Sequence, residues 1–303
     1  MGPSGKWIAI DPDDSVDEAA RRSLQARLNA VIHYLPLAAY HAEQNIEHVH
    51  RLRVSTRRAV AALELYRDWL PRKRARWVTK RLKKVRRTAG RARDLDVLAV
   101  RLTREYGERA AAVVTKIAQE RLAVQPDIVR LAERLRRDDR FVRRTAKLVG
   151  SVEPPDGTSA TDEPVIFRAW AAEQLTRVAE PFFAAIPGED AEMEAIHQFR
   201  IRGKALRYAI ELLASAFGPE LRSTCYPIVE ELQERLGKIN DHVTACDQLR
   251  EWGAEAENMD LRSAFCELAE QELASLADEL AALRAWWTAE QVEQLSRHLA
   301  PKI

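Results

Sequence analysis

Two stretches of the sequence each place a histidine at the head of a row of basic side chains. His50, Arg53 and Arg57 follow one another at intervals of three and four residues, and residues spaced in this way share one face of an α-helix. The second stretch repeats the row with His197, Arg200, Lys204 and Arg207. Guanidinium and ammonium groups donate charge-assisted hydrogen bonds to anionic oxygens, and imidazoles become stronger donors when protonated. Both rows therefore predict a surface that binds anions.

A third row of cations lies between these two stretches. Seven basic side chains fall within a narrow arc of one predicted helix: Lys73, Arg76, Lys80, Lys83, Lys84, Arg87 and Arg91. Like charges four residues apart destabilise a helix by about 0.2–0.5 kcal/mol per pair, and no acidic residue interrupts the arc. The opposite arc is apolar and predicts a buried face: Val78, Leu82, Val85, Ala89 and Ala92. A cationic ridge of this kind favours a polyanionic ligand over an ordinary solvated surface.

The distribution of charge along the chain supports the same interpretation. The net charge is only +2, but residues 51–104 contain 19 Lys and Arg against four acidic residues, a local charge of +15. The rest of the chain carries 29 basic and 42 acidic residues. One segment is thus a concentrated cation on an otherwise acidic protein, which indicates a polyanionic partner.

The elements that carry these residues are predicted to be helices, in an all-α fold. Gly and Pro are sparse among the 303 residues, and no alternating, strand-like run of useful length occurs. The helical pattern covers residues 15–41, 45–70, 72–106, 108–124 and 127–149, is interrupted by a linker, and resumes to about residue 299. No apolar window approaches the roughly 18–20 residues that span a bilayer, and no signal peptide is recognisable. We expect a cytoplasmic protein without a membrane segment, in which Cys225, Cys246 and Cys266 are reduced core residues.

The two halves of the chain resemble each other at a constant offset of 147 residues. This offset places His50 on His197 and Asp94 on Asp241 without a gap, which predicts an internal duplication. We therefore expect two four-helix-bundle-like halves related by a pseudo-two-fold axis. The predicted parts are a lead-in at 1–16, a first half at 17–149, a linker at 150–164 and a second half at 165–303, together forming one domain.

Two aspartates have positions that suggest a supporting role. Asp94 and Asp241 each follow a glycine by four residues, Gly90 and Gly237. Each carboxylate could pair with an arginine or orient an imidazole. Because a glycine inside a helix costs about 1 kcal/mol relative to alanine, we expect another group to approach the backbone closely there. A metal site built from two histidines and two aspartates is an alternative, but the neighbouring cations disfavour a further positive ion. We expect no metal and no cofactor.

Several of these segments resemble a known family. The string Val49-His50-Arg51-Leu52-Arg53-Val54 and the later Arg91-Ala-Arg93-Asp94-Leu95-Asp96 are similar to signatures of the CHAD family, the conserved histidine α-helical domain. The second half supplies Ile196-His197-Gln198-Phe199-Arg200-Ile201 and Leu236-Gly237-Lys238-Ile239-Asn240-Asp241. Four elements in the same order make the resemblance specific, and it covers about residue 17 to the C-terminus.

The resemblance implies a protein that binds inorganic polyphosphate without catalysis and associates with polyphosphate granules in a prokaryotic cytoplasm. It implies a basic groove or pore formed between the two halves. The ligands expected from matching positions and from the ridge are His50, Arg53, Arg57, Arg58, Lys73, Arg76, Lys80, Lys83, Lys84, Arg87, Arg91, His197, Arg200, Lys204, Arg207 and Lys238, with Asp94 and Asp241 in support.

The site is predicted to be lopsided, and two alternative functions remain open. The positions that match Lys80, Lys83, Lys84 and Arg87 are Pro227, Glu230, Glu231 and Glu234, so we expect the polyanion to lie mainly on the first half. A nucleic-acid-binding module is one alternative, although the aromatic residues of the basic segment do not alternate with the ridge as base stacking requires. A metal-binding or phosphohistidine enzyme that uses His50 and His197 is the other, although no Walker loop, HExxH or GxSxG motif occurs.

Overall fold

The protein is all-helical, as the sequence predicts. A computed structural model describes residues 5–155, 163–188 and 190–299. Within these ranges the chain forms ten α-helices, and the only β pairing is an isolated bridge between Ser15 and Ile166. No helix in the described part of the chain is long and apolar enough to cross a bilayer. Seven of the fifteen residues of the predicted linker 150–164, residues 156–162, lie outside the described residues.

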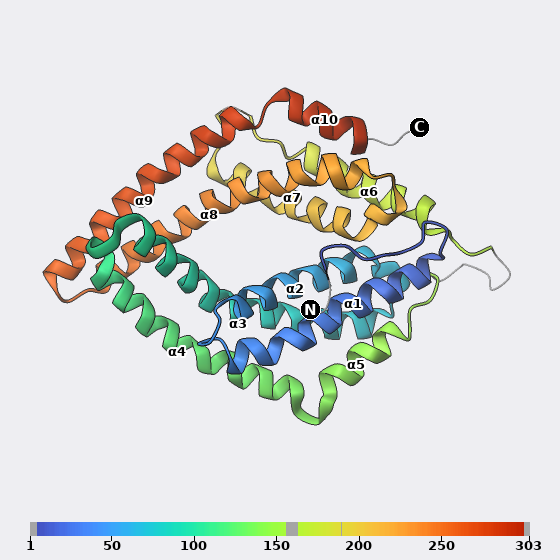
Figure 1. Ribbon diagram of the computed structural model, residues 1–303, viewed down its shortest axis with the longest axis horizontal. Coiled ribbons are helices and arrows are strands. Elements are labelled where there is room, and N and C mark those ends of the chain that lie inside the picture. The colour runs from blue at the N-terminus through green and yellow to red at the C-terminus, as the bar shows by residue number, and fades with distance from the viewer. Residues whose placement is uncertain (1–4, 156–162, 189, 300–303) are drawn as a thin grey trace.

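The helices form two groups along the chain (Figure 1). The first group consists of α1 (Val16–Tyr40), α2 (Glu47–Leu65), α3 (Arg72–Tyr106), α4 (Ala111–Arg136) and α5 (Arg140–Val149). The second group consists of α6 (Phe167–Phe183), α7 (Met193–Leu213), α8 (Tyr226–Glu255), α9 (Met259–Trp286) and α10 (Ala289–Leu299). Each half thus contains five described α-helices, one more than a four-helix bundle requires.

The order of helices repeats between the halves at close to the predicted offset. Residue 47, where α2 begins, moves to 194 when 147 is added, and α7 begins at Met193. The same operation moves the start of α4 from 111 to 258, and α9 begins at Met259. An internal duplication would give this correspondence, but similar helix bounds test neither the duplication nor the pseudo-two-fold axis, and both stay predictions.

The apolar faces predicted from helical spacing are buried. On α2 and α7 these are Val49, Leu52, Ala59, Leu63, Ile196, Phe199, Leu206 and Ile210. On α3 the whole apolar arc from Val78 to Ala92 is likewise buried. Removing these side chains from water supplies the main driving force for packing, at about 25 cal/mol per Å² of apolar surface. The assignment of all three cysteines to the core was wrong for Cys266, which is exposed, whereas Cys225 and Cys246 are buried.

Two helix boundaries differ from the prediction. The expected interruption near Pro126 is absent, because α4 continues through this residue to Arg136. The chain instead bends at Asp138 and Asp139, which have positive φ angles of 54° and 50°. Aspartate tolerates the left-handed region better than most non-glycine residues, so the break follows from two adjacent left-handed residues and not from proline.

The halves meet through more than one pair of elements. Helix α2 packs against α7, and α4 packs against α9. The N-terminal lead-in adds a further connection, because Lys6 pairs with Glu230 at 2.9 Å and the Trp7 ring lies 4.8 Å from that of Tyr226. The α2–α7 contact brings the two histidine-led rows of the sequence toward each other.

Candidate functional site

A cluster of basic side chains lies where α2 meets α7. Arg53 and Arg57 come from α2, and Arg200 and Lys204 come from α7; all four are half-buried. Their charges interact across the interface between the halves. Burial lowers the pKa of Lys204 to about 7, and the positive charges of Arg200 and Arg57 contribute to this shift. We call these four residues the central cluster.

Arg53 is the anchored member of the central cluster. Its Nη1 donates hydrogen bonds to the carbonyl oxygen of Gly90 at 2.6 Å and to Oδ1 of Asp94 at 3.0 Å. A Cβ atom on Gly90 would lie 3.2 Å from this nitrogen. The close approach to the backbone that the sequence predicts is therefore present at Gly90, and the predicted partnership of Asp94 with an arginine is present as well. Gly237 differs, because nothing approaches within 4 Å of a Cβ built there.

The other three members of the central cluster have no carboxylate partner. Arg57, Arg200 and Lys204 form no ion pair with any described acidic residue. The buried Nε of Arg200 also lacks a hydrogen-bond partner. Buried donors are rarely left unsatisfied, and each one costs about 1–3 kcal/mol. These cations are thus arranged to receive an acceptor that the protein itself does not supply.

Asp241 lies close to the cluster without neutralising it. Its carboxyl group touches solvent, yet the surrounding protein desolvates it, and its pKa is raised above the ordinary value. The charges of Arg200 and Lys204 act in the opposite direction, and that of Asp94 in the same direction. In the described part of the chain Asp241 forms no ion pair. The two aspartates that match at the 147-residue offset therefore have different local roles.

The two histidines differ in their surroundings. His50 is half-buried, and its pKa is lowered by burial and then by the positive charge of Arg93, against an opposing effect of Glu47. Its imidazole is accordingly neutral at pH 7. His197 is exposed on α7. Over the described ranges, no group of three or more His, Cys, Asp or Glu side chains has a geometry that could hold a metal ion.

The cationic ridge follows the exposed side of α3. All seven members, from Lys73 to Arg91, are exposed, and at 1.5 Å per residue they extend over about 27 Å. Only Arg91 has a carboxylate partner among the described residues, Glu120 at 3.3 Å. Asp94 follows Arg87 by seven residues, so it lies on the ridge side of α3, where it pairs with Arg53. The ridge therefore leads directly to the central cluster.

Besides Arg53 and Arg91, three more of the predicted ligands pair with carboxylates. Arg58 pairs with Glu211 at 2.6 Å, Arg207 lies 3.6 Å from the same carboxylate, and Lys238 lies 3.6 Å from Glu279. Glu211 is almost completely buried, with 1% of its side chain exposed. It needs nearby cations because an unpaired buried carboxylate is very unfavourable. Arg58 and Arg207 thus belong to a structural network beside the central cluster.

Comparison with known sequences decides the family. The family model of the CHAD domain matches residues 22–250, which is more than half of the chain. The chain belongs to the CHAD family. No curated protein sequence matches it significantly.

Solved structures show that other proteins share this CHAD fold. The CHAD domain from the plant Ricinus communis superposes with a TM-score of 0.65 at 20% identity, covering 96% of this chain and 94% of its own. PptA from Streptomyces chartreusis superposes with a TM-score of 0.63 at 18% identity, covering 94% of this chain and all of its own. At these identities the similarity establishes the fold.

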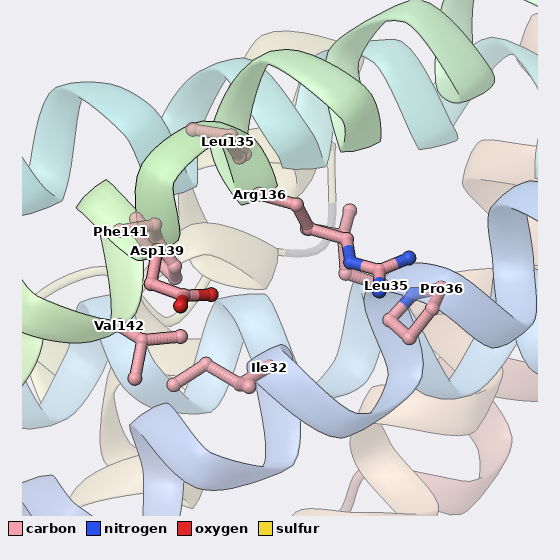
Figure 2. A pocket seen from close by; sticks show the side chains of 8 residues that line it. All are labelled: Ile32, Leu35, Pro36, Leu135, Arg136, Asp139, Phe141 and Val142. Carbon is pink, nitrogen blue, oxygen red and sulfur yellow. The ribbon is translucent and has the colours of Figure 1, made fainter.

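Two cavities of this CHAD protein lie away from the central cluster. One, with a volume of about 250 Å³, is enclosed by α1, α4 and α5 and is lined mainly by apolar side chains, with Arg136 and Asp139 among them (Figure 2). The other, of about 300 Å³, is lined by His242 and by acidic residues of α3 and α9. No predicted ligand lines either cavity.

Sequence reasoning missed two buried ionic networks. At the 147-residue offset Glu211 corresponds to Glu64, which is exposed. The signal in the sequence for the burial of Glu211 is its position in the apolar run Ile210-Glu211-Leu212-Leu213. The second network joins His242 to Glu272 at 2.6 Å and Glu272 to Arg101 at 2.8 Å. These three residues come from α8, α9 and α3, and no local pattern in the sequence connects them.

Proposed function

We propose that this CHAD protein binds inorganic polyphosphate, without hydrolysing it, along the α3 ridge and the central cluster. The observation that carries the proposal is the group of Arg57, Arg200 and Lys204, which lie together without an ion pair to any described carboxylate and include a buried donor without a partner. A polyphosphate chain offers anionic oxygens at every repeat and no bases to recognise. Such a ligand suits a series of cations better than it suits an enclosed pocket.

The central cluster contributes the specific part of this binding. The Arg200 guanidinium and the Lys204 ammonium each donate to phosphate oxygens, and charge-assisted hydrogen bonds of this kind contribute about 1.5–3 kcal/mol each. Burial, and then repulsion by Arg200 and Arg57, lower the pKa of Lys204. A bound anion opposes both effects by attracting the ammonium group, so binding favours the protonated lysine. The half-buried position of the cluster strengthens both effects relative to fully exposed charges.

The ridge attracts the polyanion over a long range and provides a series of cations along which an extended ligand can bind. Six of its seven cations have no described carboxylate partner, and each phosphate that they neutralise releases a condensed counterion. The corresponding face of α8 is acidic, with Glu230 paired to Lys6 and Glu231 to Arg235. The bound polyphosphate therefore lies on α3 and continues onto α7. The second half of the protein contributes little to binding beyond Arg200 and Lys204 of the central cluster. Association with polyphosphate granules in a prokaryotic cytoplasm would follow from this binding.

Calorimetric titration of the whole protein with long-chain polyphosphate at two salt concentrations tests the proposal. We expect tight binding that weakens with salt, and a loss of about 100-fold in affinity for Arg200→Ala/Lys204→Ala. The matched control is Arg177→Ala/Arg250→Ala, which removes two exposed arginines of the second half that have no described ion pair. Equal losses in both variants would show that only net charge matters and would overturn the assignment of the cluster.

Two further measurements separate the proposal from its rivals. Polyphosphate recovered after long incubation should keep its length, and shortening would establish an enzyme. Duplex and single-stranded DNA at equal phosphate concentration should bind more weakly. Tyr66 and Trp69 are buried in the core and present no ring on which a base could stack. Stronger binding of DNA than of polyphosphate would favour the nucleic-acid alternative.

A further inference from the structure

A second group of cations surrounds Trp77, outside the residues discussed so far. The guanidinium carbon of Arg81 lies 4.4 Å from the centre of the indole ring, that of Arg144 lies 4.5 Å away, and that of Arg140 lies 6.0 Å away. Arg81 belongs to α3, whereas Arg140 and Arg144 belong to α5. One aromatic side chain thus gathers three positive charges from two helices.

The position of Trp77 is fixed by the packing of α5 against α3. The Trp77 ring lies 6.4 Å from that of Phe141, and Phe141 is buried. The indole itself is half-buried. The arginines around it are therefore held over a ring that cannot move away, which reduces the entropy lost when a ligand binds to them.

No described acidic side chain compensates these charges. The ten Lys and Arg residues from Arg72 to Arg87 and the four of α5 form no ion pair with any carboxylate in the described ranges. A contact between a cation and an aromatic ring contributes about 0.5–1 kcal/mol at an exposed site. It does not neutralise the charge, so the three arginines still repel one another. An anion placed between them would remove that repulsion.

The group is continuous with the cationic ridge. Trp77 follows Lys73 by four residues and precedes Lys80 by three and Lys84 by seven, so it lies on the same side of α3 as these lysines. Arg140 and Arg144 are exposed. A linear ligand that follows the ridge can therefore pass over Trp77 and reach the arginines of α5 without leaving the surface.

We propose that Arg81, Arg140 and Arg144, gathered around Trp77, form a second phosphate-binding site that extends the polyanion track from α3 onto α5. The identity of the ligand as a linear inorganic polyphosphate rests on the function proposed above. The chemistry of the site favours such a ligand over nucleic acid, because guanidinium groups already lie over the indole and a base has less access to the ring.

Titration of the whole protein with long-chain polyphosphate over a series of salt concentrations tests this site. We expect Arg140→Ala/Arg144→Ala to lower the affinity about 3–10-fold and to make the slope of log K against log salt shallower by roughly 1–1.5, the value for two lost phosphate contacts at about 0.7 each. The matched control is Arg250→Ala/Arg284→Ala, which makes the same change in net charge on exposed residues of the second half without described ion pairs. The control should leave the slope unchanged.

The outcomes distinguish this inference from the proposed function. If the wild-type protein binds polyphosphate and the α5 variant keeps its affinity and salt slope, the second site is disproved and the proposed function stands. If the wild-type protein does not bind polyphosphate at all, the proposed function is disproved, and the second site, which rests on it, is disproved with it. Combining the α5 substitutions with Arg200→Ala/Lys204→Ala gives an independent check. Separate sites on one track should give losses in binding free energy that add within about 0.5 kcal/mol, and losses far from additive would overturn the assignment of two sites.

Discussion

Arg58 on α2 and Glu211 on α7 form a two-pronged ion pair across the interface between the halves, although they are 153 residues apart in sequence. Nε of Arg58 donates to Oε2 at 2.6 Å, and Nη2 donates to Oε1 at 3.1 Å. The Tyr226 hydroxyl also lies 2.9 Å from Oε1. Arg27, of which 1% is exposed, approaches the same carboxylate to 3.9 Å. This network orients α2 relative to α7 and thereby positions the central cluster.

Substituting Glu211 should lower the stability of the protein. Glu211→Gln leaves the buried Arg27 and the half-buried Arg58 without a counter-charge, and we expect the free energy of unfolding to fall by about 3–5 kcal/mol. The measurement is chemical denaturation followed by circular dichroism. Glu64→Gln is the matched control, because Glu64 occupies the corresponding position of α2 but 73% of its side chain is exposed. It should change stability by less than about 0.5 kcal/mol, and equal effects of both substitutions would contradict the structural role of Glu211.

The affinity for polyphosphate should depend on pH through Lys204. Its pKa in the free protein is about 7, because of burial and the charges of Arg200, Arg57 and Arg53, against an opposing effect of Asp241. A bound polyanion favours the protonated form and so raises this pKa. Affinity should therefore be constant well below pH 7 and fall as pH rises above 7, by up to about tenfold per unit. The measurement is a titration with long-chain polyphosphate between pH 6.5 and 8.5 at constant ionic strength.

Two variants isolate the contribution of Lys204 to this pH dependence. Lys204→Met should bind more weakly with little dependence on pH, and Lys204→Arg should keep its affinity at pH 8.5 because guanidinium remains charged. His50 does not interfere above pH 7, since its pKa is lowered from its ordinary value of 6.5. A Lys204→Arg variant that loses affinity with pH as the wild type does would refute the explanation.

The lowered pKa of Lys204 makes the stability of the free protein rise with pH, whereas the affinity for polyphosphate falls with pH. The pKa of Lys204 is lower in the folded state than the ordinary value of 10.5, so folding releases a proton between about pH 7 and 10.5. The contribution of Lys204 to stability therefore increases as pH rises through this range, and its full penalty is present below pH 7. Denaturation midpoints should accordingly rise less between pH 7 and 9 for Lys204→Met than for the wild type. An equal rise in both proteins would contradict the shift.

Reversing the charge of the ridge should abolish binding while the fold persists. In Lys80→Glu/Lys84→Glu/Arg87→Glu, six units of positive charge are lost from an exposed face. Calorimetry should detect no binding of polyphosphate at 150 mM salt, with unchanged helical circular dichroism. The matched control reverses Arg177, Arg250 and Arg284, which are exposed and without described ion pairs in the second half. If the ridge variant still bound polyphosphate, the assignment of the binding site to α3 would be wrong.

The sequence predicts this fold well where local spacing decides the outcome. The limits of α3 at Arg72 and Tyr106 agree with the prediction, and a cationic arc and an apolar arc run together along this helix between Lys73 and Ala92. The course of α4 through Pro126 was not predictable in this way. Tertiary contacts override the local cost of a proline, and Gln125 beside it donates to the carbonyl oxygens of Ala38 and Ala39.

For the candidate site, the sequence identifies the helix faces but not the partners of each side chain. Arg57 and Arg58 are adjacent and chemically identical, yet Arg58 meets a buried carboxylate from the other half and Arg57 meets none. Successive residues of a helix point about 100° apart, so the two half-buried arginines meet different groups of the other half. The carboxylate that each arginine meets depends on packing between segments more than 150 residues apart. No periodicity in the sequence predicts this pairing.

Replacing Arg101, His242 and Glu272 together should preserve the stability of the protein, whereas replacing Glu272 alone should lower it. Glu272 is fully buried and receives Nη2 of Arg101 at 2.8 Å and Nδ1 of His242 at 2.6 Å, while its Oε1 has no partner. Glu272→Gln leaves a buried guanidinium without a counter-charge and should destabilise the protein by about 3 kcal/mol or more. The triple substitution Arg101→Met/His242→Leu/Glu272→Leu removes all three buried polar groups together and should restore stability to within about 1 kcal/mol of the wild type.

Denaturation of the single and triple variants measures this difference directly. If the triple variant proves no more stable than Glu272→Gln, the three residues do not act as one compensated network, and at least one of them stabilises the contact among α3, α8 and α9 through packing alone. Recovery in the triple variant would show that the ionic groups offset one another's burial. The binding of polyphosphate provides an internal reference, because none of the three residues belongs to the central cluster or the ridge, and its affinity should stay within about twofold in every variant that folds.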